Sequence, residues 1–350
     1  MSAPHADRIR LSDPAELIAA VPHLLGFHPH DSVVLLALHG RQLGLTLRAD
    51  LVAVEQTPLL AEQMLLPMAQ QRPTGVAVIV IGGEPGPDGD PPHRCLVDVV
   101  DEVLRRAGLP VVHAAWVAAT VGGAPWRCYD DPLCAGTLAD PATTPLAAAA
   151  VAAGAVTFGN REELAALLAG DDPATLRRRA LLLRTADADH PMSADLRARR
   201  FARLEELHQQ AAQGQLELSD RTVTEVASAL CDHRVRDACL TWCTGPDAAA
   251  GERLWLALVR GTPAPERAEP AALLALTAYL RGDGALAGLA LEVALRACPD
   301  HSLSGLLRAA LDGGLPPEML RTVADDASGA VRRPPRRPRS SRSRRPRRRR

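Results

Sequence analysis

Residues 32–51 read SVVLLALHGRQLGLTLRADL, and this stretch decides the fold class of the N-terminal half. Its first part, Ser32 to Leu38, contains six consecutive apolar residues, which is typical of a buried strand. Residues 39–41 have the composition of a tight turn. Residues 43–51 alternate between apolar and other side chains, so a second strand is predicted that pairs with the first as a hairpin.

A helix is predicted immediately before this hairpin. Asp13 has the position of an N-cap, with Pro14 at the first helical position and Glu16 at the third. These start signals favour a helix through Val21, and Gly26 breaks the pattern before the first strand.

Downstream of the hairpin, helices and strands alternate. The spacing of apolar residues predicts helices over residues 57–71 and 93–107 and strands over residues 75–81 and 110–120. In the second of these helices, Cys95, Val99, Val103 and Leu104 share the face that we expect to point inward. Helices between consecutive strands imply right-handed crossovers, so the N-terminal half is predicted to be a mixed α/β sheet covered by helices.

The pattern becomes helical from Pro145 onward. Two capping boxes are predicted, one at Asn160 with Glu163 and one at Thr222 with Glu225. We therefore predict three parts, with a hinge over residues 185–193: a mixed α/β domain over 1–155, an all-α domain over 156–330 and an arginine-rich tail over 331–350.

One helical pair resembles a tetratricopeptide repeat. Helices over residues 269–281 and 284–297 are joined by the turn RGDG, and Ala287, Ala294 and Pro299 occupy that repeat's positions for small residues and its final proline. Small residues let paired helices approach closely, and the proline ends the second helix. We expect a tetratricopeptide-like hairpin packed on its neighbours, since a single repeat is not stable alone.

Two blocks of sequence resemble a known family. Residues 22–34, PHLLGFHPHDSVV, and residues 47–51, LRADL, are similar to the P-x-L-L-G-F-x-P-x-D-S-[LV]-V block and the R-x-D-L strand of an actinobacterial family, domain of unknown function 4192. The similarity extends over roughly residues 10–320, including the Ala-rich segment from Ala147 to Leu168 and the C-terminal pieces around 236–238, 262–263 and 281–284. The family carries no assigned activity, so the resemblance implies a fold neighbourhood only.

The chain departs from that family at residues 126–136. Family members often have an adjacent cysteine pair there, whereas this chain has Cys128 and Cys134 separated by five residues. A metal or redox role for the segment is therefore weakened.

The net charge hides an asymmetry between the body and the tail. The chain has 40 basic and 41 acidic residues and a formal charge of −1, and it contains no lysine. The last nineteen residues contain 12 arginines and no acid, which leaves the preceding part with 28 basic and 41 acidic residues, a charge of −13. The tail is expected to attract anionic polymers in a salt-dependent way. The arginines proposed for this are Arg332, Arg333, Arg336, Arg337, Arg347, Arg348, Arg349 and Arg350.

Several residues are candidates for a ligand site at the ends of the N-terminal strands. Arg48 and Asp50 share one face of a strand, so they could orient an anionic or planar ligand, or form a structural ion pair. Asp31 and Ser32 precede the first strand, where they could bind a ligand or satisfy backbone donors in a turn. Both interpretations stay open. The candidate walls are Trp126 and Tyr129, which equally could belong to the core.

No catalytic residue, metal or cofactor is assigned from the sequence. The loop after residue 81, GGEPG, lacks the dinucleotide-binding glycine spacing, and the absence of lysine excludes a P-loop. The set C-x-H-x5-C-x3-C from Cys231 to Cys243 lacks the paired spacing of zinc knuckles. The seven cysteines are odd in number and no signal peptide or membrane span is apparent, so we predict a cytoplasmic protein with reduced thiols.

Three functions are considered. The favoured one is a non-enzymatic binding or scaffolding protein whose helical half contacts a protein partner through residues 269–299. The first alternative is a hydrolase- or transferase-type enzyme that uses Asp31, Ser32, Arg48 and Asp50. The second is non-specific association of the tail with nucleic acid.

Overall fold

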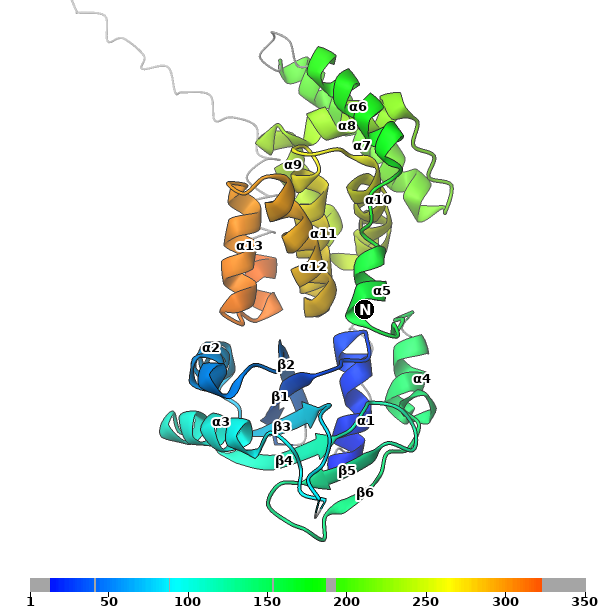
Figure 1. The fold of residues 1–350 in the computed structure, drawn as a ribbon. Helices are drawn as coiled ribbons and strands as arrows, with labels where there is room; N and C mark the ends of the chain where they lie inside the picture. Colours follow the sequence, from blue (N-terminus) through cyan, green and yellow to red (C-terminus); the bar gives the residue numbers. More distant parts are fainter. Residues whose placement is uncertain (1–12, 41, 88, 153, 187–192, 323–350) are drawn as a thin grey trace, which may run out of the picture.

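The computed structural model describes residues 13–322, except 41, 88, 153 and 187–192, and it consists of a sheet half and a helical half (Figure 1). The sheet half contains, in chain order, α1 (Pro14–Leu25), β1 (Ser32–His39), β2 (Gln42–Asp50), α2 (Thr57–Gln70), β3 (Gly75–Ile81), α3 (Arg94–Arg106), β4 (Val111–Val117), β5 (Pro125–Cys128), β6 (Ala135–Thr137) and α4 (Pro145–Ala152). The predicted mixed α/β sheet with helices is confirmed. The predicted domain limits remain a prediction.

The strand order is β2-β1-β3-β4-β5-β6. β1 pairs antiparallel with both β2 and β3, β3 and β4 are parallel, and β5 and β6 extend the sheet antiparallel. The α3 crossover between β3 and β4 produces the parallel pair. β5 and β6 were not predicted, because four and three residues are too few to show a period of two.

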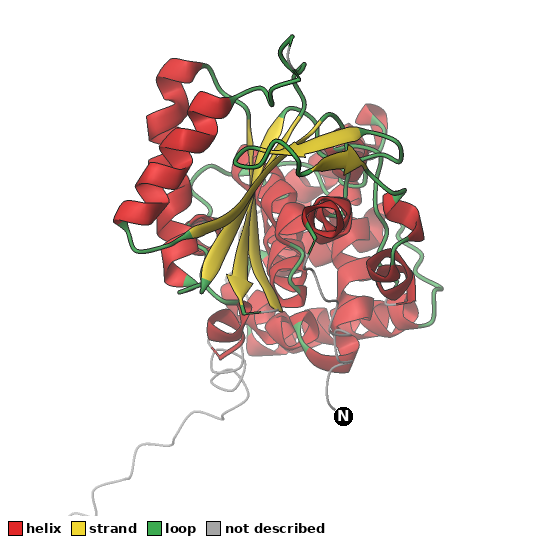
Figure 2. Ribbon diagram, turned by 90° about the horizontal axis from the view of Figure 1, so that it is seen from below, coloured by secondary structure: helices red, strands yellow, loops and turns green. Residues whose placement is uncertain are grey.

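Helices cover both faces of the sheet (Figure 2). Alternate residues of β1 point to opposite faces, so Val34 and Leu36 pack with Ile18 of α1, whereas Val33 and Leu35 belong to the apolar cluster that contains residues of α2 and α3. The continuous apolar run of β1 is therefore explained by burial on two sides.

Two details of the predicted helices in this half are wrong. α1 continues through Pro22 to Leu25 and ends at Gly26, whose φ of 76° is the left-handed conformation that suits glycine at a helix end. In α3, Cys95 is exposed, and Leu96, Val97 and Val100 are buried instead. Val103 and Leu104 are buried as predicted, and Val99 is partly buried, so the prediction fails only at the start of the helix.

The helical half contains α5 (Arg161–Ala166), α6 (Pro173–Ala186), α7 (Ala194–Ala212), α8 (Asp220–Leu230), α9 (His233–Cys239), the 3₁₀ helix η3 (Leu240–Cys243), α10 (Ala248–Gly261), α11 (Ala268–Arg281), α12 (Gly284–Ala297) and α13 (Ser302–Asp312). α11 is its central helix, because every residue from Pro270 to Leu280 is buried. A helix that is apolar on all sides is stable only when neighbours surround it, and α10, α12 and α13 all contact it.

One predicted cap is confirmed and one is wrong. The Asn160 side chain accepts a hydrogen bond from the backbone of Glu163, whose carboxylate accepts one from the backbone of Gly159. At the second position the cap is Ser219, which accepts from the backbone N–H of Thr222 (3.1 Å), so α8 begins three residues earlier than predicted. Ser219 and Thr222 are both good caps, and only the packed helix distinguishes them.

Cys128 and Cys134 form a disulfide, which corrects the expectation that all thiols are reduced. The backbone N–H of Cys128 donates to the carbonyl of Cys134 (2.8 Å), so the two cysteines close the turn between β5 and β6. The other five cysteines form no disulfide in the described part of the chain.

Hydrogen bonds connect the halves on two sides. The backbone of Phe158 donates to Gly26 and accepts from His28, which joins the segment before α5 to the end of α1. On the far side, Gln71 donates to the carbonyl of Gly314 (2.6 Å), which follows α13.

Acid is expected to weaken the helical half through Asp220. Hydrogen bonds from Arg178 and Arg179 hold the pKa of this carboxyl below its ordinary value of 3.8. A depressed folded pKa contributes stability above the unfolded pKa, and this contribution is lost as the pH falls through the folded value. Urea unfolding should show that Asp220→Asn is less stable than wild type at neutral pH, with a difference that shrinks well below pH 3.8. A difference independent of pH would contradict this expectation.

Candidate functional site

Arg48, Asp50 and Ser32 lie together at one end of β1 and β2. Arg48 Nη2 lies 2.6 Å from Asp50 Oδ1, and Arg48 Nε donates to Ser32 Oγ (2.8 Å). Ser32 Oγ in turn donates to the carbonyl of His30 (2.5 Å). Because these polar groups already satisfy one another, the arrangement supports a structural network at the sheet edge.

Asp31 lies next to this network and shapes the turn before β1. Its φ is 40°, in the left-handed region, and its carbonyl accepts from the backbone of Leu51 (2.8 Å). A Cβ atom on Gly82, whose φ is 97°, would lie 2.4 Å from Asp31 Oδ1, so the close approach of the two turns requires glycine there.

Trp126 and Tyr129 are buried, on opposite faces of the sheet. Trp126 belongs to the apolar cluster under α1, whereas Tyr129 belongs to the cluster under α3. The Tyr129 hydroxyl donates to the carbonyl of Pro92 (2.6 Å), and burial raises the pKa of that hydroxyl well above its ordinary value. The two side chains cannot line one pocket.

The strand register also separates Trp126 from Asp50. Trp126 pairs with Val117, Val117 with Ile81, Ile81 with Ser32 and Ser32 with Asp50. Four strand spacings of about 4.8 Å place their backbones roughly 19 Å apart. The ligand-binding role of the six predicted residues thus stays a prediction, and the structure groups only Asp31, Ser32, Arg48 and Asp50.

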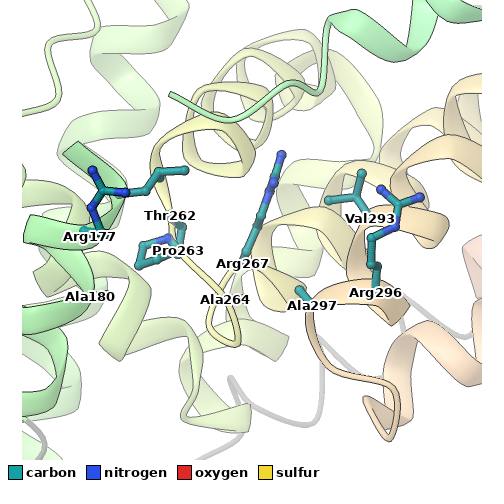
Figure 3. Close-up of a pocket in the computed structure, with 10 residues that line it drawn as sticks. Arg177, Ala180, Thr262, Pro263, Ala264, Arg267, Val293, Arg296 and Ala297 are labelled. Atoms are coloured by element: carbon teal, nitrogen blue, oxygen red, sulfur yellow. The ribbon is translucent and has the colours of Figure 1, made fainter. Parts of the chain in front are cut away.

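A cavity of about 380 Å³ lies elsewhere, in the helical half (Figure 3). Its walls come from α6, from the segment 262–267 between α10 and α11, and from α12. Its apolar lining is Leu176, Ala180, Pro263, Ala264, Val293 and Ala297. Its polar lining is Arg177, Thr262, Arg267 and Arg296.

None of the three arginines has a carboxylate within 4.0 Å in the described part of the chain. Arg267 lies between Arg177 and Arg296 in Figure 3, and the charge of Arg296 acts on it directly. Burial, followed by this neighbouring charge, lowers the pKa of Arg267, against the opposing effect of Asp171. Like charges brought together without a counterion raise the local positive potential, which attracts an anion.

Arg267 is held in place from behind. One of its Nη atoms donates to the carbonyl of Leu168, and its Nε is buried without a hydrogen-bond partner among the described residues. A second cavity, of about 190 Å³, shares Arg267, Val293 and Arg296 with the first and continues toward Gly170. Arg267 and Arg296 therefore line both cavities.

Arg179 supports the cavity wall without lining it. Its side chain is 8% exposed, and it bridges Asp171 and Asp220 (2.8 Å each) while donating to the carbonyl of Gly261 (2.8 Å). It thereby ties α6 to α8 and to the residue before the 262–267 segment. The triplet RRR at residues 177–179 is visible in the sequence, but which arginine turns inward is not.

Two further properties concern the described residues only. No group of three or more His, Cys, Asp or Glu side chains there has the arrangement to hold a metal ion. No helix within these ranges is long and apolar enough to cross a membrane. The arginines proposed for the tail, from Arg332 to Arg350, lie outside the described residues.

Comparison with known families finds a match over most of the chain. The model of the family described as domain of unknown function (DUF4192) matches residues 14–318, which include both halves. No curated protein matched the chain. No solved structure matched it either.

Proposed function

We propose that the chain, which belongs to the DUF4192 family, is a binding protein whose helical half holds a small anionic ligand. The observation that carries the proposal is the convergence of Arg177, Arg267 and Arg296 on one cavity without a carboxylate to neutralise them among the described residues. Its volume of about 380 Å³ lies within the usual range for small-molecule sites.

The lining favours binding over chemistry. Six of the ten lining residues are apolar, three are arginines and the remaining one, Thr262, is fully buried. Such a set supplies charge and apolar surface, which hold a ligand, and the enzyme alternative at Arg48 and Asp50 rests on side chains already engaged with each other.

The argument for an anionic ligand depends on the absence of carboxylate partners for these three side chains, and not on their being arginines. The chain contains no lysine, so arginine is its only strong cation wherever one is needed. Several arginines described in the helical half form ion pairs, as Arg161 does with Glu292 (2.5 Å) beside the second cavity. Three unneutralised arginines at one cavity, in a body with an excess of acid, therefore favour an anion as the missing partner.

Within residues 269–299, the surface proposed to contact a protein partner is restricted to α12. α11 is buried almost completely, so it cannot present a groove. The outward residues Val293, Arg296 and Ala297 of α12 line the cavity, and an acidic side chain of a partner would meet the same arginines. The tetratricopeptide-like interpretation rests on buried Ala287 and Ala294, which let α12 pack closely on α11.

Substitution of Arg296 tests the proposal. Isothermal titration with citrate, a multivalent anion, should detect binding to the full chain that weakens as salt is added. Arg296→Gln should weaken binding about tenfold, because a charge-assisted hydrogen bond is lost. Arg105→Gln, which removes an equally charged but remote side chain on α3, is the matched control and should bind as wild type does. Equal loss in both variants, or no binding of any anion, would refute the proposal.

A further inference from the structure

We infer that the anion is a phosphate monoester with an apolar body, held through its phosphate by Arg267 and Arg296. The inference rests on the proposed anion-binding function and specifies the class of ligand. Three features of the cavity carry it: its excess charge, the fixed position of Arg267 and its apolar wall.

The excess charge favours a dianion. Arg177, Arg267 and Arg296 together bring three positive charges to one cavity. A single carboxylate would neutralise one of them, whereas a phosphate monoester carries about −1.5 to −2 at pH 7 and offers three acceptor oxygens. Guanidinium groups match phosphate geometry because two of their N–H groups can donate in parallel.

The three arginines divide into one fixed and two adaptable cations. Arg267 is half-buried and anchored on the Leu168 carbonyl, so its position is set before a ligand arrives. Arg177 and Arg296 are exposed, on α6 and α12 respectively, and can close on the phosphate from opposite sides. A preorganised cation lowers the entropy cost of binding.

The apolar wall favours an ester over free phosphate. Leu176, Ala180, Pro263, Val293 and Ala297 surround the arginines, and inorganic phosphate would leave that surface in contact with water. An apolar substituent on the phosphate would cover it, and removal of this apolar surface from water would favour binding.

Isothermal titrations of the full chain can separate the contribution of the phosphate charge from that of the apolar wall. The probes are phenyl phosphate, benzoate and inorganic phosphate. Phenyl phosphate and benzoate share a ring and differ in their anionic group. We expect phenyl phosphate to bind about tenfold more tightly than benzoate, since one further charge-assisted contact is made, and more tightly than inorganic phosphate. Arg267→Gln and Arg296→Gln should each remove this preference, whereas the control Arg105→Gln should keep it.

The pH dependence gives a second readout that a merely structural role would not produce. The second pKa of a phosphate monoester is about 6, so the affinity for phenyl phosphate should rise from pH 5 to pH 7. The affinity for benzoate, already ionised at pH 5, should stay level. Circular dichroism of each variant verifies that the fold is retained.

The outcomes distinguish the two proposals. Benzoate binding as tightly as phenyl phosphate, with both lost in Arg296→Gln, would overturn the phosphate assignment and leave the anion-binding function standing. Absence of binding by all three probes and by citrate would overturn both.

Discussion

Replacement of Arg179 by methionine is expected to lower the free energy of unfolding by about 3 kcal/mol, because removal of one partner from a buried charge network is strongly destabilising. Arg179 makes three polar contacts at once, to Asp171, Asp220 and the Gly261 carbonyl. Methionine retains much of the aliphatic volume and removes the donors, so Asp171 and the Gly261 carbonyl lose this partner, and Asp220 keeps only its pair with Arg178. Urea unfolding followed by circular dichroism measures the change.

Arg178→Met is the matched control. Arg178 also pairs with Asp220, but its side chain is 56% exposed and water can replace its hydrogen bonds. The control should therefore unfold close to the wild-type midpoint. If the two variants lost equal stability, burial would not be the reason for the importance of Arg179.

Gly251→Ala is expected to destabilise the helical half by about 3 kcal/mol, the upper range for an overpacked site. A Cβ atom on Gly251 would lie 2.3 Å from the carbonyl oxygen of Trp242, a backbone atom that cannot rotate away. Helix propensity alone gives the opposite sign, since alanine in a helix interior is favoured over glycine by roughly 1 kcal/mol. Thermal or urea unfolding decides between the two signs.

Gly288→Ala provides the control for that substitution. Gly288 lies inside α12, and a Cβ there would meet Leu311 at 3.7 Å, an ordinary contact. This variant should gain roughly 0.5–1 kcal/mol through the reduced entropy of the unfolded chain. Stabilisation by both substitutions would show that α10 and η3 separate easily.

The strands of the sheet were predictable where the local pattern was long enough. β1, β2, β3 and β4 each have at least seven residues of continuous or alternating apolar character. β5 and β6 are shorter: β5 begins with Pro125, and every residue of β6 is exposed. Both strands are stable only because β4 offers a free edge for pairing. Their pairing is therefore determined by the tertiary structure and not by the local sequence.

The candidate site at the sheet edge was predictable in part. The i, i+2 spacing of Arg48 and Asp50 placed them on one face, and the structure pairs them. The joint use of Trp126 and Tyr129 could not be judged from the sequence. The two residues are three positions apart, and an odd offset places side chains on opposite faces only where the chain is an extended strand, which β5 showed.

The arginine cavity had no signal in the sequence. Arg177, Arg267 and Arg296 are distributed over 120 residues, and each resembles many other arginines of this chain. Only the packing of α6 and α12 around the 262–267 segment brings them together. The local sequence also does not show that Arg179 is excluded from the cavity. Arg179 is the arginine whose charge is neutralised by Asp171 and by Asp220 of α8.

The sequence by itself determined the order of helices and strands from α1 to β4, the burial of β1, the cap at Asn160 and the resemblance to the family, because these depend on neighbours within a few turns of the chain. The tertiary structure alone decided which charges are neutralised. Coulomb interactions depend on distance in space and on burial, so three arginines far apart in the chain become one positive cavity only after the helices have packed.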